Sequence, residues 1–300
     1  MIITVTLNAA LDVTYEVPSV AWDGVNRVGA VHRRAGGKGV NVARVLAALG
    51  QEVLVTGLAG GPTGRAIEHD LRAAGLPAAL TGIAAESRTT LVVSEPNGAT
   101  LFNEPGPEVT AAELAAFVER YTSLLAGADA VVVSGSVPRG VPADVYATLA
   151  AVAARAGVPA IVDADGDPLR RAPEGRPAVV KPNAEELARA VPGGTPEEGA
   201  QALRERGAEA VVVSMGADGL LAVTGEGTFR ARMPYTVRGN PTGAGDSLVA
   251  GLALGLVEGS PWPDRLRRAA ALGAAAVAAP VAGDFDGEVY ADIHPQIIIT

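Results

Sequence analysis

Residues 240–246, Asn-Pro-Thr-Gly-Ala-Gly-Asp, could do chemistry on a phosphate group. They lead into the apolar run Ser247–Leu256, so the small residues would lie at the start of a helix. Unpaired backbone N–H groups and the helix dipole favour an anion there. Asp246 would not bind phosphate itself, but it could accept the proton of an attacking hydroxyl during phosphoryl transfer. A Gly-rich loop whose aspartate only satisfies helix-end amides would show the same pattern, and the residues alone favour neither interpretation.

Two further stretches place a lysine beside a helix start. Ala35-Gly-Gly-Lys-Gly39 could form a compact anion cradle. It lacks the Gly-Lys-Ser/Thr ending of a Walker loop, however, and a tight strand-to-helix turn explains it at least as well. In Lys181-Pro-Asn-Ala-Glu-Glu186, Glu186 could hold Mg²⁺ through water. Asn183 followed by Glu186 is also the pattern of a capping box, which would only begin a helix.

Short apolar runs alternate with amphipathic stretches along most of the chain. Capping boxes at Thr110–Glu113 and Thr195–Glu198 predict the starts of two helices. The alternation predicts an α/β fold with a doubly wound, mostly parallel sheet flanked by helices. The expected buried strands are short and mostly rich in valine: Val53–Leu58, Ala130–Val133, Ala160–Val162, Ala178–Val180 and Ala210–Val213.

Two segments, Asp12–Arg34 and Arg88–Phe102, instead alternate polar and apolar residues, as strands with one solvated face do. Pro96-Asn97-Gly98 predicts a hairpin turn in the second segment. We therefore expect a small β lid of residues 12–35 and 87–103, inserted into a main domain of residues 1–11, 36–86 and 104–300. An apolar lid face would need a partner, which favours a homodimer formed through the lid.

The composition restricts the classes of function. The 24 Lys and Arg residues against 33 Asp and Glu residues give a net charge of −9, which argues against a nucleic-acid partner. The absence of cysteine excludes disulfides, thiolate metal sites and cysteine nucleophiles. The three histidines, His32, His69 and His294, have no metal-site spacing. The N-terminus resembles a first strand and not a signal peptide, and the longest apolar run is shorter than the ~20 residues that cross a bilayer. We therefore expect a cytoplasmic protein with no membrane partner.

The order of these stretches resembles that of the ribokinase-like (PfkB) carbohydrate kinases, and specifically their 1-phosphofructokinase and tagatose-6-phosphate kinase branch. Three signatures carry the resemblance: Gly36–Arg44, Lys181–Glu186 and Asn240–Leu252. Other matching segments are Thr6–Asp12, Ser87–Thr89, Asn103–Pro107, Ser134–Gly140 and Val213–Gly219. The resemblance covers nearly the whole chain up to about Gly283. It implies a kinase that uses ATP and Mg²⁺ and closes a lid over a sugar.

The resemblance also implies roles for individual residues. Asp246 would be the catalytic base, and the anion hole for the transferred phosphoryl group would consist of Gly243, Ala244 and Gly245. Sugar hydroxyls would be held by Asp12, Gly37 and Asn41. The phosphate already on the sugar would meet Lys38 and Arg88, with Ser136 nearby and Arg27 adding a cation from the lid across a dimer interface. The nucleotide would face Lys181, Asn183, Ser214, Gly216 and Gly219, while Glu186 would organise Mg²⁺ through water.

The chain departs from the family pattern at several positions. Ala9 stands where this branch usually has proline. Asp165 places a carboxylate near the expected phosphate region, where serine is usual. Pro241 and Thr242 replace Thr-Val or Ser-Val, and a proline at position 241 also occurs in tagatose-6-phosphate kinases.

The favoured reaction converts fructose 1-phosphate to fructose 1,6-bisphosphate, with tagatose 6-phosphate and fructose 6-phosphate as alternative substrates. An idle regulator that only binds a sugar phosphate is the alternative from a different class, and Asp246 argues against it because a binder needs no base. A nicotinamide-dependent enzyme is excluded, because no G-x-G-x-x-G turn follows the first strand.

Overall fold

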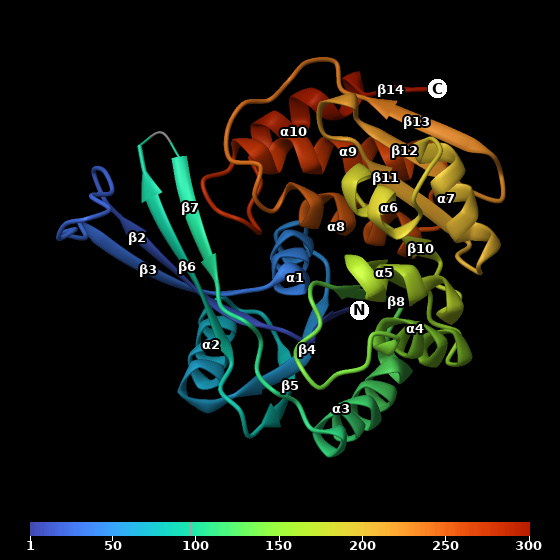
Figure 1. Ribbon diagram of the computed structural model, residues 1–300. Coiled ribbons are helices and arrows are strands. Elements are labelled where there is room, and N and C mark those ends of the chain that lie inside the picture. The colour runs from blue at the N-terminus through green and yellow to red at the C-terminus, as the bar shows by residue number, and fades with distance from the viewer. Residues whose placement is uncertain (97) are drawn as a thin grey trace.

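The computed structural model describes residues 1–96 and 98–300, which build a ten-stranded sheet and a separate four-stranded sheet (Figure 1). The strands of the large sheet, in spatial order, are β14 (Ile298–Ile299), β13 (Thr228–Arg232), β12 (Leu220–Val223), β11 (Ala210–Ser214), β10 (Val179–Val180), β9 (Ala160–Asp163), β8 (Ala130–Ser134), β1 (Ile2–Thr6), β4 (Val53–Gly60) and β5 (Ala78–Ile83). The strands from β11 to β5 run parallel, while β12, β13 and β14 pair antiparallel at one end.

The central parallel strands are mostly apolar, as strands covered on both faces of a sheet are. All five residues of β1 and all five of β8 are buried. The chain continues from β1 to β4 on one side and later returns as β8 on the other, so the direction of winding reverses beside β1. In such sheets a ligand crevice opens at this reversal, outside the carboxyl ends of the strands.

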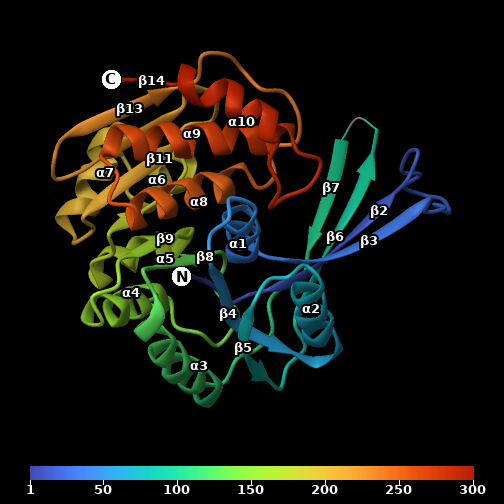
Figure 2. The same cartoon turned by 180° about the vertical axis from the view of Figure 1, so that it is seen from behind.

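Helices cover both faces of the large sheet (Figures 1 and 2). One face packs against α1 (Lys38–Ala48), α2 (Gly61–Ala73), α8 (Ala244–Val257), α9 (Trp262–Ala278) and α10 (Gly287–Ile293). The other packs against α3 (Ala111–Leu124), α4 (Val145–Arg155), α5 (Gly166–Arg171), α6 (Ala184–Ala190) and α7 (Pro196–Glu205). Among the described residues, no helix has both the length and the apolar character needed to cross a bilayer.

Local sequence signals explain where several helices begin. Thr110 and Glu113 form the capping box that starts α3, and Thr195 and Glu198 form the one that starts α7, as predicted. Short 3₁₀ turns complete the helical elements: η1 (Leu125–Gly127), η2 (Ala172–Gly175), η3 (Gly216–Asp218) and η4 (His294–Gln296). Ten residues of α8 are buried, which accounts for a helix that is apolar on all sides.

The small sheet projects from the main domain (Figures 1 and 2). Its strands, in spatial order, are β3 (Ala30–Gly36), β2 (Ala10–Glu16), β6 (Arg88–Glu95) and β7 (Gly98–Asn103). The predicted hairpin turn includes Asn97, which lies outside the described residues, and the flanking strands pair antiparallel with Glu95 opposite Gly98. The predicted fold class, a mostly parallel α/β sheet with a small additional sheet, is confirmed. We call the small sheet the lid.

Candidate active site

Asp246 lies in the first turn of α8, at the carboxyl edge of the large sheet. The helix begins after Gly243, whose φ of 86° is left-handed, and a Cβ at this position would come within 2.9 Å of the Cα of Ala282. Among the described residues no side chain caps α8, so its first amides have no side-chain partner and remain suited to an anion. Asp246 is only 6% exposed, and its Oδ2 accepts a hydrogen bond from Asn41 Nδ2 at 2.8 Å.

The surroundings of Asp246 bring its pKa close to neutral pH. Burial raises the pKa of Asp246 to about 7, and the carboxylate of Asp163 adds to this rise. The hydrogen bond from Asn41 and the charges of Lys38 and Lys181 lower the pKa of Asp246, but they do not outweigh burial. A carboxylate with this pKa is both ionised and a competent proton acceptor at physiological pH.

Asp163, the last residue of β9, is fully buried between two lysines. Its Oδ1 lies 3.3 Å from Lys181 Nζ and 3.4 Å from Lys38 Nζ, and its Oδ2 accepts a hydrogen bond from Ser134 Oγ at 3.2 Å. Burial alone would raise the pKa of Asp163, but the two ammonium groups outweigh burial and hold this pKa below its ordinary value. One buried carboxylate therefore fixes two cations beside the start of α8.

The two carboxylate oxygens of Glu186 have different surroundings. Asn183 and Glu186 form the capping box that begins α6, with Asn183 N donating to Glu186 Oε2 at 2.7 Å. The other oxygen, Oε1, lies 4.0 Å from Lys38 Nζ. Within residues 1–96 and 98–300, no three side chains of metal-binding type gather into a cage. This arrangement suits Mg²⁺, which is commonly held by one or two carboxylates, water and substrate phosphates.

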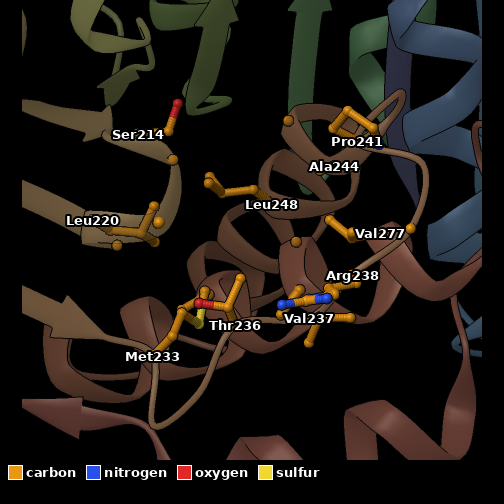
Figure 3. A pocket seen from close by; sticks show the side chains of 18 of the residues that line it. Ser214, Leu220, Met233, Thr236, Val237, Arg238, Pro241, Ala244, Leu248 and Val277 are labelled. Carbon is orange, nitrogen blue, oxygen red and sulfur yellow. The ribbon is translucent and has the colours of Figure 1, made fainter.

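A largely apolar pocket of about 570 Å³ lies on one side of this centre (Figure 3). Leu220, Leu248, Val237 and Val277 surround it, with Ser214 at the end of β11 and Ala244 at the start of α8 (Figure 3). Gly216 and Gly219 also line this pocket. Both have a positive φ, and a Cβ on Gly219 would come within 2.0 Å of the carbonyl oxygen of Ala231. The flat aromatic faces of a nucleotide base fit such a lining.

Lys181 links this pocket to the buried cluster. A Cβ on Gly245, which lines the pocket, would lie 3.4 Å from Lys181 Nζ. Asn183, which caps α6, also forms a backbone bridge with Ser214 at the end of β11. The predicted nucleotide residues thus lie along the carboxyl ends of β10 and β11.

A second, polar pocket of about 460 Å³ lies on the other side of the centre, beside β1 and β8. Gly37, Lys38, Arg88 and Ser136 line it, together with Asn8. Asn8 joins two of these residues, because its Nδ2 donates to Ser136 Oγ at 2.9 Å and its carbonyl oxygen accepts from Arg88 Nε at 3.2 Å. Two cations, a hydroxyl and an amide therefore line one small cavity together with one acidic residue, Glu104, and the two cations suit a phosphorylated sugar.

Asp12 lies where the lid joins this second pocket. Burial raises the pKa of Asp12, whereas a hydrogen bond with Thr90 and the charges of Arg88 and Arg34 lower it. A Cβ on Gly36 would collide with the carboxylate of Asp12, at 2.0 Å from its Oδ2. Glycine at position 36 therefore lets the carboxylate lie against the backbone at the lid junction.

Two residues of interest lie apart from this centre. Arg27 is exposed on the connection between β2 and β3 and lines neither pocket. Asp165 begins α5, and its carboxylate oxygens lie 2.9 and 3.0 Å from Arg189 Nη2. The negative charge of Asp165, expected near the phosphate region, is therefore offset by an arginine of α6.

Sequence reasoning missed several residues that shape the site. The role of Asp163 was not recognised, although a polar residue directly after the apolar run Ala160–Val162 was an available signal. Asn8 follows β1 in the same way. The nucleotide-side pocket also uses residues 233–239 and α9, which carry no local motif.

The family model for pfkB carbohydrate kinases matches residues 5–285 of this chain. The chain belongs to this family. Phosphofructokinase-2 from Escherichia coli, solved in complex with potassium, is 30% identical, with 98% of each chain covered and a TM-score of 0.92. A possible 1-phosphofructokinase from Thermotoga maritima is 27% identical, with 100% of this chain and 98% of that chain covered and a TM-score of 0.89.

These similarities confirm the predicted family and enzyme class. The chain is a sugar-phosphate kinase of the pfkB family, with phosphofructokinases among its structural neighbours. Membership of this family implies the use of ATP, typically together with a divalent metal ion.

Proposed function

We propose that this kinase transfers the γ-phosphoryl group of ATP to fructose 1-phosphate and so produces fructose 1,6-bisphosphate. The supporting observation is that an apolar pocket and a cationic pocket lie on either side of one centre, formed by Asp246 and by the lysines that share Asp163. Tagatose 6-phosphate and fructose 6-phosphate are the alternative substrates. Phosphofructokinase-2 from Escherichia coli has been solved in complex with fructose 6-phosphate, which gives that alternative a specific basis.

In this proposal, the phosphate already on the sugar binds in the second pocket against Lys38, Arg88 and Ser136. The acceptor hydroxyl then lies beside Asp246. Because Asn41 occupies Oδ2 of Asp246, Oδ1 is the oxygen that receives the hydroxyl proton. The hydroxyl oxygen bonds to the γ-phosphorus, the bond from that phosphorus to the β–γ bridging oxygen breaks, and ADP leaves.

The remaining residues stabilise the charge on the transferred group. The backbone N–H groups after Gly243 would donate hydrogen bonds to its oxygens at the positive end of the α8 dipole. Mg²⁺ bound to the nucleotide phosphates would supply further positive charge. Glu186 would help to hold this ion through water with Oε1, because the capping box already occupies Oε2.

We further propose that the kinase is a homodimer formed through the lid. Trp22 and Val25, on the connection between β2 and β3, and Phe102, on β7, expose 73%, 88% and 47% of their surface, which is unusual for large apolar side chains close to one small sheet. Pairing with the lid of a second copy would cover them. Arg27, from the same exposed connection as Val25, would then be available to the sugar pocket of the partner.

The substrate proposal is tested by following ADP release with Mg-ATP and a panel of acceptors. The panel contains fructose 1-phosphate, fructose 6-phosphate, tagatose 6-phosphate, fructose and ribose. We expect the highest kcat/KM with fructose 1-phosphate. A preference for another ketohexose phosphate would overturn the substrate assignment, and turnover on unphosphorylated sugars alone would also overturn the roles given to Lys38 and Arg88.

A further inference from the structure

Arg34, on lid strand β3, forms a forked ion pair with a distant segment of the main domain. Its Nη2 lies 2.6 Å from Asp284 Oδ1, and its Nη1 lies 3.3 Å from Asp284 Oδ2. The same Nη1 donates to the carbonyl oxygen of Ala282 at 3.2 Å. The two side chains are only 29% and 46% exposed, so water screens the pair incompletely. Three contacts therefore attach the lid to the connection between α9 and α10.

That connection packs directly against the catalytic turn, residues 240–246. A Cβ on Gly243 would come within 2.9 Å of Ala282 Cα and 3.1 Å of Gly283 N. Asn240 Nδ2 also donates to the carbonyl oxygen of Pro280 at 3.4 Å. The α9–α10 connection, red in Figures 1 and 2, lies between the lid and α1 in both views. It therefore supports the turn that carries the catalytic base.

The same connection also contacts the partner of the catalytic base. A Cβ on Gly283, whose φ is 82°, would come within 3.1 Å of Asn41 Oδ1. Asn41 in turn donates to Asp246 at 2.8 Å. A continuous set of packed groups thus runs from Arg34 through residues 282–284 to Asp246.

We infer that Arg34 and Asp284 are positioning residues that couple the orientation of the lid to the placement of Asp246. The inference rests on the kinase function. Without the ion pair, the α9–α10 connection can move away from Gly243 and Asn41, and the lid loses a fixed contact with the main domain. A base displaced by a fraction of an ångström loses alignment with the acceptor hydroxyl, so turnover falls even though both pockets persist.

Arg34 could also act by a simpler route, because its charge lowers the pKa of Asp12. Asp284 separates the two explanations. If Arg34 acted only through Asp12, removal of Asp284 would leave turnover unchanged. If the ion pair is the acting unit, removal of either partner has the same effect.

The test is a double-mutant cycle with Arg34→Ala, Asp284→Ala and the double variant. We expect each single variant to lower kcat by about 3- to 30-fold and to change the KM for ATP little. We expect the double variant to lose no more than either single variant. Arg230→Ala is the matched control, because Arg230 forms a similarly half-exposed ion pair with Glu197, at 2.8 Å and remote from the site. The control should alter thermal stability to a comparable degree and leave kcat unchanged.

Unchanged kcat in Arg34→Ala or in Asp284→Ala would overturn the inference, and so would additive losses in the double variant. Arg34→Gln and Asp284→Asn provide the same cycle if an alanine variant does not fold. Hydrogen exchange at residues 240–246 is the readout that does not depend on turnover. It should accelerate in Arg34→Ala and not in Arg230→Ala. If the wild type turned over no sugar phosphate, the substrate assignment would fail, while hydrogen exchange would still decide whether the coupling exists.

Discussion

The ionisation of Asp246 should govern the acidic side of the pH–rate profile. Because burial raises the pKa of Asp246 to about 7, kcat/KM should fall by about tenfold for each pH unit below neutrality. The hydrogen bond from Asn41 to Oδ2, at 2.8 Å, favours the ionised form. A hydrogen bond to a charged group contributes about 1.5–3 kcal/mol, which corresponds to about 1–2 pKa units. Asn41→Ala should therefore move the midpoint of the acidic limb of the pH–rate profile upward by about 1–2 pH units.

Asp163→Asn should move the same midpoint in the opposite direction. The negative charge of Asp163 raises the pKa of Asp246, so its removal should lower that pKa and extend activity to more acidic solution. The assay is kcat/KM for the sugar phosphate from about pH 5 to pH 9 in the wild type and both variants. The phosphate of the substrate also titrates in this range, but it does so identically for all three enzymes. A midpoint that stayed in place, or that moved in the same direction in both variants, would refute this account of Asp246.

Three further predictions concern stability, substrate binding and assembly. Because folding raises the pKa of Asp246 from 3.8 to about 7, its ionisation costs the folded state about 4 kcal/mol above neutral pH, and this cost disappears near pH 4. Asp246→Asn should therefore raise the thermal unfolding midpoint at about pH 8 and change it little at about pH 4. Equal effects at the two pH values would contradict the raised pKa of Asp246. Arg88→Ala should raise the KM for the sugar phosphate by about 10- to 100-fold and leave the KM for ATP unchanged, as measured by steady-state kinetics. An unaltered KM for the sugar phosphate would show that Arg88 does not bind the phosphate. Trp22→Asp should convert dimers to monomers in light scattering, and a dimer that persists would place the interface elsewhere.

Local patterns were sufficient to predict the fold and part of the site. The capping boxes of α3 and α7, the valine-rich buried strands and the alternating lid strands each depend on neighbouring residues, so the sequence displays them directly. The turn that carries Asp246 was also recognisable, because small residues and an aspartate at a helix start form a compact signal.

Contacts between distant segments could not be predicted in this way. Asp163 meets Lys38 across 125 positions of the chain, and Arg34 meets Asp284 across 250. Neither pair has a local signature, because only the tertiary fold brings its members together. The ion pair between Asp165 and Arg189 on α6 likewise has no local signature in the sequence.

The most direct test of the central claim compares nucleotide binding and turnover in Asp246→Asn. Asp165→Asn is the matched control, because this carboxylate is exposed and paired with Arg189. Turnover is measured as ADP release in the presence of the preferred sugar phosphate, and nucleotide affinity by calorimetry. We expect Asp246→Asn to bind nucleotide like the wild type and to lose about two to four orders of magnitude in kcat, while Asp165→Asn keeps normal turnover. Near-normal turnover in Asp246→Asn would contradict the assignment of Asp246 as the catalytic base.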